Sequence, residues 1–271
     1  MAGTDLIISD IHGHFDLLTK IETIPKFTDY RVVFLGDMID RGPASLQVLR
    51  YVQKMVQAQS AIAIRGDHED MFLGYLSQDT AAQQLYIQND GATTLHDMLG
   101  DDYIAYNVPH NQQLIKSRYA DLISFIASLP YYYQDDHRLY VHGGIYPEGL
   151  QATPDLAKLW LREDYWFQEH DWSFKHAAAL LSRNHVPDFG HNPVAQTLVT
   201  GHTITTMIYG QLPKDQGKIT RYGDHQAAVV AVQYKGEYPR VFIDGGSYVY
   251  QNLNVLQLGT AGEIQAVYQL N

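Results

Sequence analysis

The sequence contains no cysteine, and this absence excludes one means of stabilisation and one class of metal site. Without cysteine, the chain has neither a disulfide framework nor a thiolate ligand. Any bound metal must therefore be held by histidine, aspartate, glutamate or asparagine, which are donors that suit hard or borderline cations.

Positive charge is also scarce. The chain has 19 lysines and arginines against 30 aspartates and glutamates, for a formal net charge of -11. It therefore lacks a broad cationic surface that could neutralise a nucleic-acid backbone. We predict no extended nucleic-acid binding, although a few arginines or metal ions could still hold a small phosphorylated substrate.

Long apolar runs are missing as well. No run approaches the roughly 20 residues that cross a bilayer, and residues 1–5 lead into an apolar strand without the features of a signal peptide. We expect a cytoplasmic protein that does not enter a membrane. At 271 residues, the chain can bury a sizeable core, and we expect a single domain spanning residues 1–271.

Short apolar runs alternate with segments of helical periodicity. The runs 6–8, 32–35 and 61–64 each end in a polar turn and are followed by apolar residues at helical spacing, and the third leads into a long helical segment that ends near residue 129. This alternation predicts an α/β layered fold, in which ligands collect at the carboxyl ends of strands.

The second half of the chain is expected to change from helices to strands. The runs 139–141 and 197–200 are predicted strands, 155–167 is predicted to be helical, and a further helix is predicted near residues 177–181. From about residue 226 the helical period disappears. Four β-rich runs are expected to form a second sheet together: 228–232, 241–243, 255–258 and 264–268.

Five strand ends carry an acid or a histidine close to a glycine. In chain order they are Asp-x-His-Gly from Asp10, Gly-Asp-x-x-Asp-Arg-Gly from Gly36, Gly-Asp-His-Glu from Gly66, His-Gly-Gly from His142 and Gly-His-Thr from Gly201. A dinuclear metal site needs ligands from several loops and a bridging carboxylate, and glycine lets such loops approach closely. Each motif alone is common by chance, but the ordered set is specific.

The ordered set resembles the calcineurin-like metallophosphoesterase superfamily and, within it, the PPP-type serine/threonine phosphatases of bacteria and phages. The resemblance extends from Asp10 to the turn at residues 243–246. It implies a central β-sandwich of two mixed sheets flanked by helices, and two divalent metal ions, with manganese expected and iron or zinc as alternatives. The metal ligands that it implies, with Asp37 as the bridge, are Asp10, His12, Asp37, Asp67, His142 and His202.

The resemblance also implies a chemistry, which is direct in-line attack of a metal-activated water on phosphorus. His68 would be the general acid that protonates the leaving oxygen, oriented by Asp40. Arg41 and Arg162 would bind the phosphate through their guanidinium groups. The leading interpretation is a phosphomonoester hydrolase, specifically a serine/threonine protein phosphatase that acts on a phosphorylated protein or a small phosphorylated molecule.

Position 67 departs from the pattern of the family. The third motif of the family normally has Asn where this chain has Asp67. Aspartate offers a ligand oxygen in the same geometry but adds a negative charge, so the site should hold cations more tightly and make a bound water less acidic. We expect activity to survive, because the other motifs are intact.

Two other functions stay open. Residues 41–46 also resemble the second motif of the symmetric dinucleoside tetraphosphate hydrolases, although many of those are expected to have an apolar residue in place of Asp40, which favours the phosphatase. The other alternative is a catalytically weak protein that binds a phosphorylated or metal ligand, and it is motivated by Asp67 alone.

The candidate residues also have structural explanations. Aspartate and histidine at strand ends often cap helices, Asp40 and Arg41 could form a surface ion pair, and Arg162 could be a solvated helical residue. Glu69 is interpreted as a charge in a first helical turn, and His14 as a rim residue at most. A third metal site is not expected among the other histidines, which are interpreted as surface or loop residues: His96, His110, His137, His170, His176, His185, His191 and His225.

Overall fold

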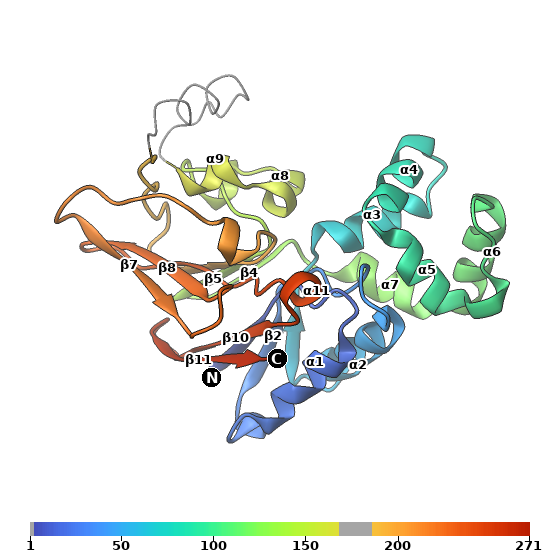
Figure 1. Ribbon diagram of the computed structural model, residues 1–271, viewed down its shortest axis with the longest axis horizontal. Coiled ribbons are helices and arrows are strands. Elements are labelled where there is room, and N and C mark those ends of the chain that lie inside the picture. Colours follow the sequence, from blue (N-terminus) through green and yellow to red (C-terminus); the bar gives the residue numbers. More distant parts are fainter. Residues whose placement is uncertain (1–2, 168–185) are drawn as a thin grey trace.

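The computed structural model describes residues 3–167 and 186–271. Two β-sheets stack against each other and helices cover their outer faces (Figure 1). This arrangement confirms the predicted β-sandwich of two mixed sheets flanked by helices. The helix predicted near residues 177–181 lies outside the described residues. Within the described part, no helix is long and apolar enough to cross a membrane.

The first sheet has the strand order β11-β10-β1-β2-β3. Its parallel strands are β1 (Asp5–Ile8), β2 (Arg31–Phe34) and β3 (Ala61–Ala63). On the other side of β1 lie β10 (Leu253–Leu258) and β11 (Ile264–Leu270), each antiparallel to its neighbour.

The second sheet has the strand order β4-β5-β6-β9-β8-β7. The central strands β5, β6 and β9 run parallel, whereas β4, β8 and β7 pair antiparallel. The strands are β4 (Tyr132–Gln134), β5 (Arg138–Val141), β6 (Thr197–Thr200), β7 (Gly217–Tyr222), β8 (Val229–Tyr234) and β9 (Arg240–Phe242).

One prediction about the sheets is wrong. The four late β-rich runs do not form one sheet, because only β8 and β9 join the second sheet while β10 and β11 return to the first. Local composition identifies a strand but not the strand that pairs with it. Since every residue of β10 is buried, its sequence does not show to which sheet it belongs. The sequence does not predict β7, because it is an edge strand whose exposed Lys218 and Arg221 give it no apolar alternation.

Side-chain alternation along β1 shows how the layers pack. Leu6 and Ile8 belong to the core formed with the helices, including Leu49. Ile7 points to the opposite face and belongs to the core between the sheets, together with Val199 of the second sheet. Since successive side chains of a strand point to opposite faces, a strand covered on both sides reads as a continuous apolar run.

The helices lie in three groups. Beside the first sheet are α1 (Phe15–Thr19), the 3-10 turns Lys20–Thr23 and Phe27–Asp29, and α2 (Ser45–Gln57). A helical insert follows β3 and consists of α3 (Asp67–Tyr75), α4 (Thr80–Gln88), α5 (Gly91–Leu99), the 3-10 turn Gly100–Asp102, α6 (Val108–Arg118) and α7 (Ala120–Ser128). Near the second sheet are the 3-10 turns Leu150–Ala152 and Thr205–Met207, α8 (Asp155–Trp160) and α9 (Glu163–Trp166). The short helix α11 (Ser247–Tyr250) lies between the two sheets, where the Ser247 hydroxyl donates to the Asp10 carbonyl (Figure 1).

The helical insert confirms the predicted helical segment that ends near residue 129. The predicted helix over 155–167 is instead interrupted at Arg162, which precedes α9 with a non-helical φ of -130° and ψ of -105°.

The two sheets bring the carboxyl ends of their parallel strands to one place. The loop after β1 is bonded to the loop after β2, since the Asp10 amide donates to the Gly36 carbonyl at 3.2 Å. The loop after β6 crosses between the sheets, because the His202 amide donates to the Asp10 carboxylate at 3.0 Å. All five predicted motifs therefore meet at this edge of the sandwich.

Arg240 offers a test of how the second sheet is held to α9. Its side chain is buried and donates to the carbonyls of Tyr165, Trp166 and Gly190. Replacing it by methionine leaves these carbonyls without their donor, and we expect Arg240→Met to lower the free energy of unfolding by about 3 kcal/mol. Urea unfolding measures this, with Arg221→Met on the exposed edge strand β7 as the control. Equal stability of the two variants would contradict the bonding described here.

Candidate metal centre

The loops that carry the motifs have unusual backbone conformations. Twelve non-glycine residues in the described part of the chain have positive φ, and six of them are predicted site residues. Such conformations cost on the order of 1–3 kcal/mol and cluster at functional sites. The six are Asp10 (55°), His12 (47°), Asp37 (53°), Asp40 (70°), Arg41 (68°) and His202 (66°).

Two glycines let the second and third motifs touch. Gly36 has a φ of 88°, and a Cβ atom there would lie only 2.5 Å from the Gly66 amide nitrogen. A Cβ at Gly66 would lie 2.2 Å from Oδ1 of Asp37. Any larger residue at either position would push the two loops apart.

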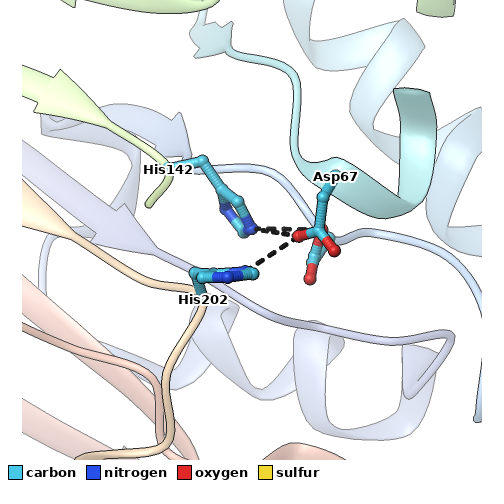
Figure 2. Close-up of side chains that lie close together, drawn as sticks. Asp67, His142 and His202 are labelled. Atoms are coloured by element: carbon cyan, nitrogen blue, oxygen red, sulfur yellow. Dashed lines mark hydrogen bonds and ion pairs between the residues drawn. The ribbon is translucent and has the colours of Figure 1, made fainter. Parts of the chain in front are cut away.

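Asp67 at the start of α3 and His142 and His202 in the loops after β5 and β6 point toward one another (Figure 2). The Asp67 Oδ1 atom lies 2.9 Å from His142 Nε2 and 2.9 Å from His202 Nδ1. Oδ1 of Asp37 lies 3.2 Å from His142 Nε2. All four residues are buried, and their ligand atoms lie within 4.8 Å of one another.

A second buried cluster consists of His12, Asp37 and His68. Here Oδ2 of Asp37 lies 3.6 Å from His12 Nε2. Asp37 is therefore shared, with one carboxylate oxygen facing each cluster. Neither cluster includes Asp10, whose buried carboxylate accepts hydrogen bonds from the His202 amide and the Ser9 hydroxyl. Two buried clusters that share a carboxylate are consistent with a dinuclear metal site.

The orientation of two histidines fits metal binding. Nδ1 of His12 donates to the Ile39 carbonyl at 3.0 Å, and Nδ1 of His142 donates to the Leu35 carbonyl at 2.7 Å. A backbone carbonyl on one ring nitrogen leaves the lone pair of the other facing the site, which is the usual arrangement of histidine ligands. His202 adds an unsatisfied atom, since its buried Nε2 has no hydrogen-bond partner among the described residues.

The charges of the site offset one another. Burial raises the pKa of Asp37, but the imidazoles of His142 and His68 outweigh burial and hold this pKa well below its usual range. Burial and Asp37 raise the pKa of Asp67, but His202 and His142 hold it below its usual range. Burial would lower the pKa of His142, yet Asp37 and Asp67 raise it well above the ordinary value. The raised pKa of His142 thus lets a proton on this ring balance the buried carboxylates, and a bound cation would replace that proton.

His68 of the second cluster forms a buried pair with Asp40, with 2.7 Å between Nδ1 and Oδ2. Burial would lower the pKa of His68, but Asp37 and Asp40 raise it to about 9. The alternative of an Asp40–Arg41 surface ion pair is wrong, because Asp40 has no exposed surface and pairs with His68.

The two candidate arginines lie beside histidines of the two clusters. Arg41 Nη1 lies 2.7 Å from His12 Nε2, and its guanidinium lies 4.3 Å from the centre of the Tyr248 ring. Arg162 donates to the Thr203 hydroxyl at 2.6 Å and to the His202 carbonyl at 3.3 Å. Arg162 is therefore not a solvated helical residue.

Glu69 does more than the sequence indicated. Its predicted place in a first helical turn is confirmed, and its buried carboxylate also accepts hydrogen bonds from the amides of Asp37, Met38 and Gly66. Burial and the nearby Asp37 raise the pKa of Glu69 to about 7. Glu69 thus links the second motif to the third by hydrogen bonds. The local sequence does not predict these contacts with backbone amides.

Two buried residues of the helical insert also reach the site. The hydroxyls of Tyr86 and Thr94 both donate to Oδ1 of Asp40. Neither residue lies at a strand end or in a motif, so no sequence signal identified them.

The other histidines are mostly remote from the clusters. His14 is almost buried beside the first motif, with 9% of its surface exposed. As predicted, the remaining described histidines are not buried: His96, His110, His137, His191 and His225. Of these, His96 and His110 lie on helices. His170, His176 and His185 lie outside the described residues.

Comparisons with known proteins agree with this geometry. The calcineurin-like phosphoesterase family model matches residues 6–210. The asymmetrical bis(5'-nucleosyl)-tetraphosphatase of Bacillus subtilis (strain 168) is 27% identical over 180 residues, which are 56% of this chain and 72% of that protein. The symmetrical bis(5'-nucleosyl)-tetraphosphatase of Coxiella burnetii is 28% identical over 145 residues, covering 52% of this chain and 42% of that protein.

A solved structure of a provisionally assigned diadenosine tetraphosphatase has a similar fold, with a TM-score of 0.58, 15% identity and coverage of 99% of this chain and 94% of that one. The predicted superfamily and the predicted metal-dependent phosphoric ester hydrolase are confirmed, whereas the narrower resemblance to protein phosphatases stays a prediction. The motifs, the buried clusters and the extent of the family match show that the chain belongs to the calcineurin-like phosphoesterase family.

Proposed function

We propose that the chain, acting as one domain over residues 1–271, hydrolyses dinucleoside polyphosphates. The observation that carries the hydrolytic function is the pair of buried clusters that share Asp37. The similarity to two bis(5'-nucleosyl)-tetraphosphatases supports the substrate class. We therefore prefer a dinucleoside tetraphosphate hydrolase, which the sequence offers as an alternative, to the leading interpretation of a serine/threonine protein phosphatase.

Six residues would hold two divalent cations. His12 and Asp10 would hold the first, Asp37 would bridge, and Asp67, His142 and His202 would complete the second. We propose manganese, and this donor set also accepts iron or zinc. When bound, such cations polarise phosphoryl oxygens and lower the pKa of a nucleophilic water.

The protein's own side chains would orient the substrate and move the proton. His68 donates through Nδ1 to Asp40, so the proton that it can transfer is the one on Nε2. We propose that His68 gives this proton to the leaving oxygen as general acid. Arg41 and Arg162, which lie beside His12 and His202, would bind phosphate oxygens.

A surface hollow next to Arg41 supports a substrate larger than a simple phosphate. It extends from Arg41 onto the helical insert as far as Tyr103, and would give room to a nucleoside beyond the phosphates. Its lining residues are Arg41, Gly42, Pro43, Ala92, Thr93, His96, Asp97 and Tyr103.

A serine/threonine protein phosphatase is the second candidate, and the His68–Asp40 pair favours it. An alkoxide leaving from phosphoserine is strongly basic and needs a proton, whereas a nucleotide leaving from a polyphosphate is a weaker base and needs one less.

A substrate panel tests the proposal. The chain loaded with Mn²⁺ is assayed against diadenosine tetraphosphate, a phosphopeptide, an aryl phosphate and an aryl phosphodiester. We expect the highest kcat/KM for the tetraphosphate, with ADP as the product of symmetric cleavage or AMP and ATP as the products of asymmetric cleavage. A preference for the phosphopeptide would support the second candidate instead, and no turnover of any substrate would favour a binding protein.

Replacing His68 tests its proposed role as general acid. We expect His68→Asn to lower kcat by about 10²-fold or more for a substrate with a basic leaving group, and much less for p-nitrophenyl phosphate. Asp40→Asn should move the alkaline limb of the rate profile to lower pH, because Asp40 helps to raise the pKa of His68. Exposed His137 provides the control His137→Asn. Equal losses with both leaving groups would contradict the assignment.

The natural Asp67 should strengthen metal binding. Asp67→Asn keeps a ligand oxygen but removes a negative charge, so we expect about tenfold weaker Mn²⁺ binding by calorimetry. Asp70→Asn is the control, since Asp70 lies in the same helix and pairs with Arg65 rather than with the clusters. The natural chain should show metal-dependent turnover, and turnover that appears only in Asp67→Asn would mean that Asp67 abolishes activity.

A further inference from the structure

Two hydroxyl groups from the helical insert converge on one carboxylate oxygen. Tyr86 of α4 donates to Oδ1 of Asp40 at 2.8 Å, and Thr94 of α5 donates to the same oxygen at 2.5 Å. All three side chains are fully buried. A buried carboxylate requires hydrogen-bond donors. For Oδ1 of Asp40, both donors come from the helical insert and neither comes from the loop that carries Asp40.

The second oxygen of Asp40 is left for the candidate acid. Oδ2 lies 2.7 Å from Nδ1 of His68. Because the two hydroxyls hold Oδ1, the carboxylate cannot rotate freely about its axis. The orientation of the His68 ring is therefore set from the far side by Tyr86 and Thr94.

Thr94 also holds the backbone of Asp40. The amide of Asp40 donates to the Thr94 hydroxyl oxygen at 2.9 Å and lies 3.1 Å from the Ser45 hydroxyl. Asp40 has a φ of 70°, a conformation that persists only when its surroundings impose it. The insert thus fixes both the main chain and the side chain of this residue.

We propose that Tyr86 and Thr94 are positioning residues for the His68–Asp40 pair. The helices α4 and α5, which carry them, would then contribute to the hydrolytic site. This inference rests on the role proposed for His68. When either hydroxyl is removed, the Asp40 carboxylate can turn, and His68 no longer presents its proton in line with the leaving oxygen. The consequence should be largest when the leaving group needs that proton.

The side chains allow conservative variants. The Tyr86 ring packs against those of Phe72 and Tyr75, with centroids 5.8 Å and 5.3 Å away, so Tyr86→Phe keeps the packing and removes only the hydroxyl. Thr94→Val keeps the shape of the side chain, and Thr94→Ser restores a hydroxyl. Tyr75→Phe is the matched control, since the Tyr75 ring lies in the same cluster and its hydroxyl does not reach Asp40.

The experiment measures kcat and KM of the full chain with Mn²⁺ for phenyl phosphate, which has a basic leaving group, and p-nitrophenyl phosphate, which does not. Thermal unfolding and Mn²⁺ affinity are measured on the same samples. We expect Tyr86→Phe and Thr94→Val to lower kcat for phenyl phosphate about tenfold or more, with a smaller loss for p-nitrophenyl phosphate and unchanged KM. Thr94→Ser and Tyr75→Phe should stay near the natural chain.

Other outcomes overturn the inference in distinguishable ways. If His68→Asn loses activity on phenyl phosphate but Tyr86→Phe and Thr94→Val do not, the positioning role is wrong and the role of His68 stands. Equal losses on both esters, or no rescue by Thr94→Ser, would also show a merely structural contact. If His68→Asn keeps its activity, the proposed role of His68 is wrong and this inference falls with it. If the natural chain hydrolyses neither ester, the same variants are compared on diadenosine tetraphosphate, and Tyr86→Phe and Thr94→Val must then lose activity together with His68→Asn or the positioning role is wrong. Should Tyr86→Phe fail to fold, the Thr94 variants decide.

Discussion

The shared carboxylate of Asp37 is the interaction on which the site depends. One of its oxygens faces His142 and the other faces His12, so it joins the loops of both sheets. The cost of burying this charge is offset by the surrounding imidazoles and by the His68 amide, which donates to Oδ1. Several features serve this one position, among them its positive φ and the contact of its amide with Glu69.

The electrostatics of the site separate two tasks. At the shared carboxylate, Asp37 and Asp67 raise the pKa of His142, and a bound cation would displace the proton of this ring, so metal binding and proton release are linked. His68 belongs to the second cluster but also pairs with Asp40, and Asp40 accepts hydrogen bonds from the helical insert. One region is therefore suited to neutralise phosphate charge and the other to supply a proton. A phosphate ester with a basic leaving group depends on the supplied proton, whereas a phosphoric anhydride depends more on the neutralisation of charge.

Much of the site could be predicted from the sequence, because its residues follow apolar strands at short, fixed spacings beside glycines. The spacing from Asp37 to Asp40 is local, and it correctly placed both in one loop. What could not be predicted depends on contacts between distant segments. β10 gives no local sign that it pairs with β1, and Tyr86 lies 46 residues from Asp40 within a segment that carries no motif. Glu69 was recognised as a first-turn charge, but its bonds to the second motif exist only in the folded chain.

Anomalous diffraction from crystals of the natural chain grown with Mn²⁺ would test the central claim most directly. The account predicts two manganese peaks, both bound by the Asp37 carboxylate, one beside His12 and the other beside Asp67, His142 and His202. A single peak at saturating metal, or two peaks that do not share Asp37, would contradict it.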